Sequence, residues 1–308
     1  MHLISRLQTA LWLIGVSGCV FAGLRLGLWS LRLKLVMAGV AMLPRLDSFR
    51  HAPRYDGLRR ALEERPEIIG ALVWPYVDSR WSARARMEAL AQHFAALDQP
   101  RRQLLAFAAS ESVEIARLPS DAECYRLVLD KPSWFIREGQ VALNLFREER
   151  RLYSLVFSMG VRDGEEVCYV GAIQGVAGDD VQEIYRTLTK RLYGMRPRDL
   201  LIETLRVCCD AMGVDQLLFV ADQHRHQRAG HYFDTAQLPT LTNYDAIWID
   251  RGACLRGDGF FALPARHGPR NLNSVPSNKR SMYRKRGELT DELFRNVTLR
   301  FGAAAAGR

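Results

Sequence analysis

The chain of 308 residues is predicted to be an α+β protein, in which a helical N-terminal region precedes a mixed, largely antiparallel sheet flanked by helices. Apolar residues recur at helical spacing as far as residue 118, and beyond it they form short runs rich in valine, leucine and aromatic residues. The apolar content of 48% is typical of a packed globular protein and excludes wholesale disorder. We therefore expect an apolar N-terminal helix over residues 1–43, a helical region over residues 44–118 and an α+β domain over residues 119–308.

The first element is an apolar segment in which residues 10–24 carry no charge. These 15 residues fall short of the ~20 that a helix needs to span a bilayer. Apolar sequence with Trp12, Trp29 and a few basic residues continues past them, which is typical of a helix lying in the membrane interface. Two alternatives remain, namely a signal sequence that is cleaved or lipidated at Cys19 and an ordinary core helix. We expect the segment to bind bilayers without spanning them.

Residues 44–118 follow with a basic, helical pattern. Pro66 interrupts this pattern, because proline lacks the N–H group that a helix interior uses. The next helix is expected to end near Leu97 and to be capped by Ser79 or Ser82. No site chemistry is predicted in this region, and its aromatic residues are interpreted as packing residues.

Short strand-like runs separated by turn residues come next, and they predict an antiparallel meander of about four or five strands. The predicted strands cover residues 125–130, 133–138, 141–148, 151–160 and 165–175. Turns are expected at residues 130–132, 138–139 and 162–164.

Two helices and three further strands complete the prediction. The first helix covers residues 178–194 and the second residues 196–213, where Pro197 suits the first helical turn and Gly213 ends the helix. An apolar stripe marks the buried face of the second helix: Leu201, Leu205, Cys208 and Met212. The further strands are predicted at residues 214–222, 244–250 and 258–264.

This order of elements resembles the GNAT superfamily of acyltransferases, so the expected sheet is GNAT-like. In that family a loop of pattern Q/R-x-x-G-x-G/A at a helix N-terminus holds the pyrophosphate of coenzyme A. The segment RLYGMR, residues 191–196, matches the first two fixed positions, has Arg196 at the third, and follows an extra helix. The resemblance implies a donor site for acyl-CoA or an acyl-carrier donor, formed by Gln174, Arg191, Gly194, Arg196 and Arg198. The alternative is a glycine–proline break between two packed helices, with the arginines solvated or paired to Asp199 and Glu203.

A longer resemblance rests on RLYGMRPRDLL, LLFVADQHRH, NYDAIWID and SNKRSMYRKRGEL, with PYVDSRWSARARMEALAQHF before them. These segments are similar to the VirK/YbjX family of Gram-negative bacteria, over roughly residues 32–293. The resemblance implies a role in envelope integrity, including resistance to antimicrobial peptides and support of outer-membrane virulence proteins. It implies no established reaction and no requirement for a cleaved signal.

The segment DQHRHQRAGH has loop composition and contains candidate catalytic residues. His224, His226 or the nearby Tyr244 would transfer the proton during catalysis, because an unperturbed imidazole titrates near pH ~6.5. His231 and Cys254 could complete a metal site, but no second firm ligand pair exists, and no metal is expected. The six cysteines contain no C-x-x-C pair, and we interpret them as reduced thiols.

A basic cluster near the C-terminus is the remaining candidate site: Lys279, Arg280, Arg284, Lys285 and Arg286. With a net charge of +9 for the chain, this cluster suits an anionic membrane surface or a phosphate-bearing substrate. The alternative is a solvated helix face. Nucleic acid is not favoured, since no recognition module is visible.

These observations predict an envelope-maintenance protein on the cytoplasmic face of the inner membrane, acting as an acyltransferase. The alternative function is a non-catalytic, membrane-associated adaptor that binds anionic lipid through its arginines. The sequence specifies no protein partner, acceptor substrate or oligomeric state.

Overall fold

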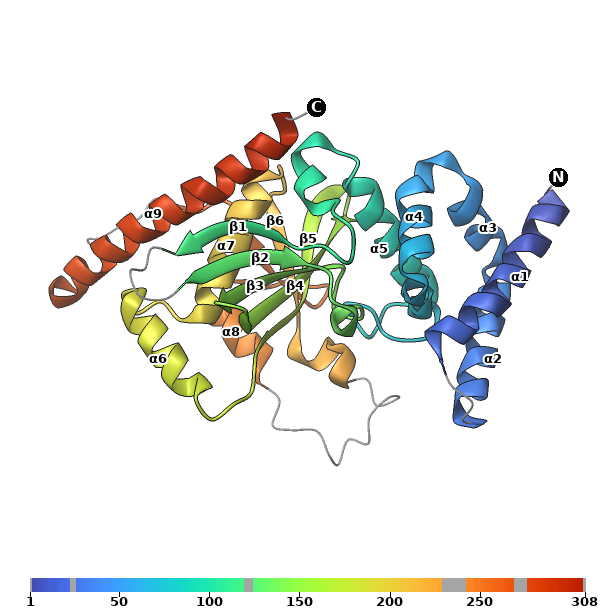
Figure 1. The fold of residues 1–308 in the computed structure, drawn as a ribbon, viewed down its shortest axis with the longest axis horizontal. Coiled ribbons are helices and arrows are strands. Elements are labelled where there is room, and N and C mark those ends of the chain that lie inside the picture. The colour runs from blue at the N-terminus through green and yellow to red at the C-terminus, as the bar shows by residue number, and fades with distance from the viewer. Residues whose placement is uncertain (1, 23–25, 119–123, 229–241, 269–275, 307–308) are drawn as a thin grey trace.

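A computed structural model describes residues 2–22, 26–118, 124–228, 242–268 and 276–306. Helices of the N-terminal region lie at one end of the longest axis, a sheet occupies the middle, and one long helix covers the other end (Figure 1). The buried apolar side chains form a core that extends from Leu13 to Phe301.

The N-terminal end consists of short helices that pack on one another. The first two form a helical hairpin, in which a Cβ added at Gly39 would lie 2.0 Å from a methyl group of Leu13, so the two helices are in close contact there. The first helix begins eight residues before the uncharged run that the sequence suggested. The elements are α1 (His2–Val20), α2 (Leu26–Ala41), α3 (Leu43–His51), η1 (Pro53–Tyr55), α4 (Asp56–Glu64), η2 (Pro66–Leu72), α5 (Ala83–Ala96) and η3 (Pro100–Leu105).

Two local predictions for this region are confirmed. α4 ends at Glu64, and Pro66 begins the 3-10 helix η2. Ser82 caps α5, since its side chain accepts a hydrogen bond from the backbone N–H of Ala85 at 3.2 Å.

Replacing Ser82 by alanine is expected to lower the free energy of unfolding by about 1 kcal/mol, because the first turn of α5 loses the oxygen that accepts its N–H group. Chemical denaturation measures this change. Ser79→Ala is the matched control, because Ser79 uses its backbone N–H, bonded to the carbonyl of His224, and should cost clearly less. Equal losses in the two variants would contradict the role of Ser82.

The sheet has the order β1-β2-β3-β4-β5-β6-β8-β7, and every neighbouring pair is antiparallel except β5 and β6. This arrangement confirms the predicted α+β class with a mixed, largely antiparallel sheet. The strands are β1 (Val113–Leu118), β2 (Tyr125–Asp130), β3 (Val141–Arg147), β4 (Arg150–Arg162), β5 (Glu165–Gly175), β6 (Gln216–Val220), β7 (Cys254–Leu255) and β8 (Phe260–Pro264).

The parallel pair β5–β6 positions the candidate site. Its ladder joins residues 167–170 to residues 216–219, whereas β5 continues to Gly175 and β6 ends at Val220. The last residues of β5 therefore have no β6 partner. Ligands of sheets with parallel strands bind beyond the carboxyl ends of those strands, so a ligand is expected at this end of the pair.

Helices α6 (Val181–Arg191) and α7 (Pro197–Ala211) connect the parallel strands. Pro197 occupies the first turn of α7 and Gly213, with φ of +74°, follows its end, as predicted. The predicted stripe is buried, and α7 contacts β3, β4, β5 and β6 on one side and α9 (Ser277–Ala306) on another.

Three predicted elements are wrong. Residues 113–118 form strand β1, because they pair with β2 through an antiparallel ladder that a helical pattern does not reveal. Residues 133–138 begin as a 3-10 turn, η4 (Ser133–Phe135), which follows Pro132. Residues 244–250 form the helix α8 (Tyr244–Asp250), whose N-cap Asn243 accepts the N–H of Ala246 at 3.1 Å.

Candidate functional site

Three chain segments meet beside the open end of the β5–β6 pair. They are the segment before α5, the β2–β3 connection, and the segment after β6 that contains η5 (Asp222–His224) and η6 (His226–Arg228). The N–H of Val77 donates to the carbonyl of Arg137 at 2.7 Å, and the N–H of Ser79 donates to the carbonyl of His224 at 2.9 Å. We call their buried polar side chains the polar cluster: Tyr76, Glu138, Gln140, Arg225, His226 and Tyr244.

Two glycines bring the β2–β3 connection against the sheet. A Cβ at Gly171 of β5 would lie 2.0 Å from the carbonyl oxygen of Glu138, and one at Gly139 would lie 2.6 Å from that of Phe157. Larger residues would collide with backbone at both positions. The close approach fixes Glu138 next to the part of β5 that lacks a β6 partner.

Glu138 is the acidic member of the polar cluster. Its Oε1 accepts a hydrogen bond from Nε2 of Gln227 at 3.0 Å and lies 3.3 Å from Nδ1 of His226, while its Oε2 has no hydrogen bond. Burial raises the pKa of Glu138 to about 7, against the opposing effect of Arg137 and Arg225. The carboxyl group can therefore exchange a proton near neutral pH.

His226 is the neighbouring imidazole and is uncharged at neutral pH. Burial, and then the charges of Arg137 and Arg225, lower the pKa of His226 to about 3. Its Nδ1 makes no hydrogen bond. A neutral imidazole beside a carboxyl group of raised pKa forms a pair that can accept a proton from a substrate.

Gln140 and Tyr76 form the polar floor behind this pair. The hydroxyl of Tyr76 lies 2.7 Å from Oγ of Ser158, and burial raises the pKa of Tyr76 to about 12, which keeps it protonated. The side-chain amide of Gln140 is buried close enough to the Tyr76 hydroxyl to oppose the rise in its pKa, but neither the nitrogen nor the oxygen of the amide makes a well-aligned hydrogen bond. An unsatisfied buried polar group costs about 1–3 kcal/mol, so this arrangement favours a polar ligand that would satisfy the amide.

Tyr244 and Arg225 close the cluster on the side of β6. The N–H of Ile173, in the part of β5 that lacks a β6 partner, donates to the hydroxyl oxygen of Tyr244 at 3.0 Å. The guanidinium of Arg225 lies 3.6 Å from the centre of the Tyr244 ring and donates to Oδ1 of Asp222 at 3.0 Å. Burial raises the pKa of Tyr244 to about 12, so its hydroxyl keeps its proton.

The backbone beside the cluster is strained. Val77 has φ of 56°, in a region that β-branched residues rarely adopt. Asp78 is completely buried and receives two side-chain N–H groups of Arg80, the nearer at 2.6 Å. Such strain persists only where surrounding contacts maintain it, and it concentrates at functional sites.

The predicted donor loop between α6 and α7 uses its backbone N–H groups internally. The N–H of Gly194 donates to the carbonyl of Thr189 at 2.8 Å, and those of Tyr193 and Met195 donate to the carbonyls of Lys190, in α6, and of Leu192, its C-cap, at 3.1 Å. These bonds close the C-terminus of α6. Phosphates at this loop would therefore have to contact arginine side chains and not these three amides.

Arginines and aspartates form a corner at the start of α7. Arg196 and Arg198 each lie 3.5 Å from Asp250, and Arg198 lies 3.4 Å and Arg251 3.7 Å from Asp199. Because the corner has more guanidinium groups than carboxylates, it attracts an anion. The carboxylates of Asp199 and Asp250 would compete with that anion for the guanidinium groups.

The other predicted donor residues lie on α6 and β5. Arg191 is exposed at the end of α6, with its guanidinium 6.0 Å from the ring centre of Tyr125. Gln174 is exposed near the end of β5 and lies opposite Ser154 of β4.

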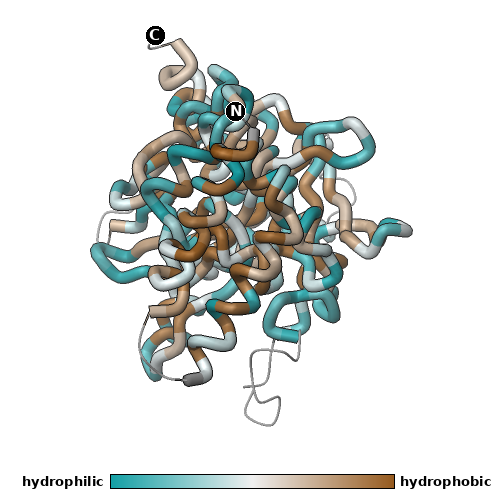
Figure 2. Tube along the Cα trace, turned by 90° about the vertical axis from the view of Figure 1, so that its right-hand side faces the viewer, coloured by the Kyte–Doolittle hydropathy of each residue, from teal (hydrophilic) through white to brown (hydrophobic). Residues whose placement is uncertain are grey.

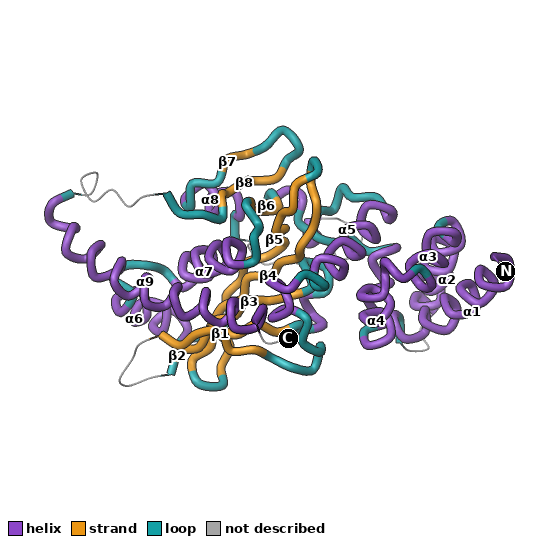
Figure 3. The backbone as a smooth tube through the Cα atoms, turned by 90° about the horizontal axis from the view of Figure 1, so that it is seen from above, coloured by secondary structure: helices purple, strands orange, loops and turns teal. Residues whose placement is uncertain are grey.

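The predicted basic cluster lies at the start of α9. Lys279, Arg280 and Arg284 are exposed, whereas Arg286 is partly buried and donates through Nε to the carbonyl of Tyr193 at 2.9 Å. Arg286 therefore attaches α9 to the predicted donor loop. The start of α9 and the α1–α2 hairpin lie at opposite ends of the molecule (Figures 1 and 3).

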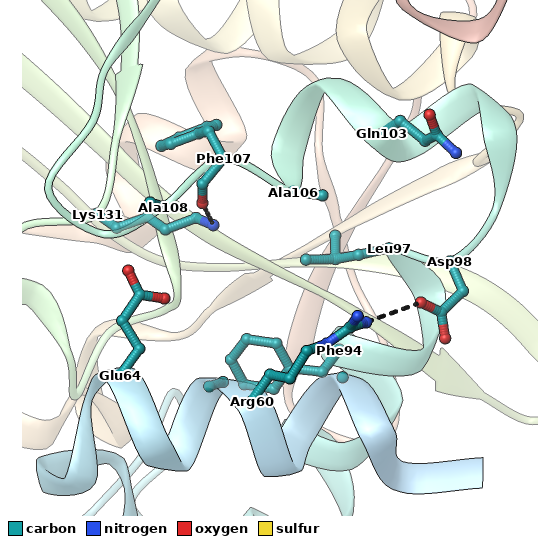
Figure 4. Close-up of a pocket in the computed structure, with 12 residues that line it drawn as sticks. Arg60, Glu64, Phe94, Leu97, Asp98, Gln103, Ala106, Phe107, Ala108 and Lys131 are labelled. Carbon is teal, nitrogen blue, oxygen red and sulfur yellow. Dashed lines mark hydrogen bonds and ion pairs between the residues drawn. The ribbon is translucent and has the colours of Figure 1, made fainter. Parts of the chain in front are cut away.

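A cavity of about 690 Å³ lies between α4, α5 and the segment after η3 (Figure 4). Its floor is apolar, with Phe94 and Leu97, and an ion pair of 3.8 Å joins Arg60 and Asp98 at its edge. Burial lowers the pKa of Lys131 to about 8, and its Nζ donates to the carbonyl of Phe107. The sequence had suggested no site here.

Two observations concern metals and membranes. Within the ranges that the structure describes, no three His, Cys, Asp or Glu side chains form a group that could hold a metal; His231 lies outside them. The described residues contain one helix, Leu3–Val20, that is long and apolar enough to cross a membrane, and 22% of it is buried in the protein. Gly27–Ala41 and Leu43–His51 would pass the same test together but are bent by 82°.

The structure thus brings His226 and Tyr244 together with residues that sequence reasoning missed. Glu138 was assigned to a turn, Tyr76 was interpreted as a packing residue, and Gln140 was given no role. The available signal was a carboxylate inside the apolar stretch SWFIREGQVAL, residues 133–143.

The chain matches the DUF535 family, described as "Protein of unknown function (DUF535)", over residues 28–298. It is 23% identical to "Uncharacterized protein YbjX" of Escherichia coli over 271 residues. The aligned region covers 86% of this chain and 81% of that protein. An uncharacterized protein of Haemophilus influenzae is 26% identical over 227 residues, 74% of each chain. "Membrane protein LapB" of Mannheimia haemolytica is 24% identical over 203 residues, 63% of this chain and 88% of that protein.

Proposed function

This chain belongs to the DUF535 family and is similar to YbjX, and from that premise we propose that it is an acyltransferase acting at the membrane of the bacterial envelope. One observation carries the proposal. The open end of the parallel β5–β6 pair holds a buried carboxyl group, Glu138, beside a neutral imidazole and an unsatisfied amide. This is the arrangement that removal of a proton from an acceptor hydroxyl or amine requires.

The proposed chemistry divides between the two sides of the cluster. An acyl thioester, from acyl-CoA or an acyl carrier, supplies the activated carbonyl carbon. Glu138 would take the proton of the acceptor as the new bond to that carbon forms and the carbon–sulfur bond breaks. Glu138, with a pKa of about 7, would then give this proton to the leaving thiolate, so that the carboxylate is restored. Tyr244, which keeps its own proton at neutral pH, would donate a hydrogen bond to the thioester carbonyl oxygen.

Phosphates of the donor would contact the corner formed by Arg196 and Arg198, with Gln174 and Arg191 at its approach. Helix α8 connects this corner to the polar cluster, because Asp250 at its end pairs with both arginines and Tyr244 at its start contacts Arg225. Its seven residues extend about 10 Å. The extended arm that carries the acyl group in acyl-CoA is longer than this distance. It could therefore reach from the corner to the polar cluster.

The proposed cellular location is supported by a relative and by the N-terminal helix. One relative is named a membrane protein, and an apolar helix begins this chain, which supports membrane association. We propose the cytoplasmic face of the inner membrane, where acyl thioesters are available. Resistance to antimicrobial peptides and support of outer-membrane proteins, implied by the family resemblance, would be consequences of envelope modification.

A second candidate is a non-catalytic adaptor whose arginines bind anionic lipid. It is favoured by the internal use of the loop amides, and by the exposed basic residues Lys279, Arg280 and Arg284 at the start of α9. An adaptor would bind lipid headgroups without selecting a thioester donor.

Addition of acyl-CoA is expected to stabilise the protein, because a ligand that binds only the folded state shifts the unfolding equilibrium. The gain at a concentration 100 times Kd is about 2.7 kcal/mol. Arg191→Ala should remove most of this gain. Arg186→Ala is the matched control, because Arg186 is an exposed arginine of the same helix that pairs with Glu183. Absence of any shift at millimolar acyl-CoA would favour the adaptor.

A further inference from the structure

The α1–α2 hairpin exposes an unusually apolar surface. Of the fifteen large apolar side chains exposed among the described residues, nine belong to these two helices. Figure 2 views the molecule from this end, with apolar stretches of the tube in brown. We call them the hairpin surface: Leu3, Ile4, Leu7, Leu11 and Ile14 of α1, and Trp29, Leu33, Met37 and Val40 of α2. Each set recurs mainly at intervals of three or four residues and so forms one stripe along its helix.

The opposite face of α1 is held by the protein. Leu13 and Val16 are buried against the helices behind them. Asp47 of α3 accepts hydrogen bonds from Ser5 and from Thr9, the latter at 3.0 Å. Although burial alone would raise the pKa of Asp47, these hydrogen bonds lower it, so the residue is a carboxylate at neutral pH. Helix α1 therefore already packs on the protein through one face, and its exposed apolar stripe lies on the other face.

Basic residues predominate in the sequence of the hairpin, and the carboxylate that contacts it, Asp47, is held by Ser5 and Thr9 on the packed face of α1. Residues 1–46 contain five basic residues, Arg6, Arg25, Arg32, Lys34 and Arg45, and no acidic residue. The guanidinium of Arg32 lies 4.8 Å from the ring centre of Trp29, an arrangement suited to the boundary between headgroups and acyl chains. An apolar stripe bordered by basic residues is complementary to an anionic bilayer.

We propose that the hairpin surface docks on an anionic lipid bilayer, with α1 and α2 lying in the plane of the interface and neither helix spanning it. Spanning would require α1 to leave Asp47, or would carry that carboxylate into hydrocarbon, which costs several kcal/mol. A second copy of the chain is a poorer occupant, because two such surfaces would bring together basic residues of like charge, among them Arg6, Arg32 and Lys34. The proposal rests on the membrane location proposed above and is independent of acyl transfer.

The test is flotation of the full-length protein with vesicles of phosphatidylcholine, alone or mixed equally with phosphatidylglycerol. Two double variants remove the stripes, Leu7→Glu with Leu11→Glu and Leu33→Glu with Met37→Glu. Each is expected to lower partitioning about 100-fold, since two apolar side chains leave the bilayer. Ile249→Glu with Leu255→Glu is the matched control, because these side chains are 61% and 64% exposed elsewhere and should change partitioning less than ~2-fold.

The orientation of α1 is tested by measuring how deep its two ends lie in the bilayer. Tryptophan introduced at Leu3 or at Ile14 should be quenched equally by shallow brominated lipids, because a helix in the interface keeps both at one depth. A spanning helix would separate these positions by about 16 Å in depth and would overturn the proposal.

The possible failures are distinguishable. If the wild-type protein does not float at all, the proposed membrane location is wrong together with this inference. If it floats and the hairpin variants float equally, the location stands and the hairpin surface is not the contact. A lipid-free dimer that the hairpin variants dissociate would identify the surface as a self-association interface. Acyl-CoA stabilisation should be unchanged in all hairpin variants, so its loss or absence bears only on the acyltransferase.

Discussion

Replacement of Glu138 by glutamine is expected to stabilise the folded protein by about 3 kcal/mol at pH 8. The pKa of Glu138 is raised by burial from 4.5 to about 7, so the folded state binds its proton more tightly than the unfolded state. The contribution of this group to stability is fully present below about pH 4.5 and is lost as the pH rises through about 7. Glutamine does not titrate, so the variant avoids this loss.

The measurement is urea denaturation of both proteins between pH 4 and pH 8, within about the range of the two pKa values. The difference in unfolding free energy should grow with pH and level off above pH 7. His226 titrates in the opposite sense, since its pKa is lowered to about 3, but its effect is common to both proteins and cancels if the variant leaves its surroundings unchanged. A difference that is constant over this range would show that Glu138 is not held in a desolvated site.

The same variant should lose acyl transfer by about 100-fold or more, because the group that takes the acceptor proton is absent. Gain of stability with loss of activity distinguishes a functional carboxyl group from a structural one. A variant that is stabilised and fully active would remove Glu138 from the proposed mechanism while leaving the membrane location intact.

Glu166→Ala is expected to destabilise the protein by about 3–5 kcal/mol, the cost of leaving a buried charge without its partner. Arg102 of η3 is 1% exposed and donates to both carboxylate oxygens of Glu166 of β5, at 2.8 and 2.6 Å. The pair fixes the helical region to the sheet. Removal of the carboxylate leaves the guanidinium buried in this position.

Glu149→Ala is the matched control. Glu149 also pairs with an arginine, Arg126, at 2.9 Å, but its side chain is 95% exposed. Such pairs contribute about 0–1 kcal/mol. Equal losses of unfolding free energy in the two variants would show that burial of Arg102 does not determine the energy of its pair.

The elements that sequence predicted well had two independent signals each. Helix α7 combined a 3.6-residue apolar stripe with Pro197 at its start and Gly213 after its end, and α5 combined such spacing with the cap Ser82. Residues 244–250 had only a short apolar run, which fits a strand or a buried helix equally well. The deciding contact is tertiary, since Nε1 of Trp248 donates to the carbonyl of Val220 at 2.9 Å.

The site was predictable only in part, for a similar reason. His226 and Tyr244 were selected by residue type, and the fold brings them near each other through Arg225. Glu138 has only a weak local signal, its position in an apolar stretch, because its chemistry comes from burial beneath segments distant in sequence. The donor loop shows the reverse case, in which a local pattern was visible but three of its amides serve a helix end.

Helix α8 has a consequence for the order in which ligands bind. An anion that binds Arg196 and Arg198 must displace Asp250, and Asp250 and Tyr244 are the two ends of one helix of about two turns. Movement at one end of so short and stiff a rod changes the other, where Tyr244 holds the N–H of Ile173. In the proposed mechanism, arrival of a donor would thus be transmitted to the acceptor side before any chemistry, so we expect the donor to bind before the acceptor.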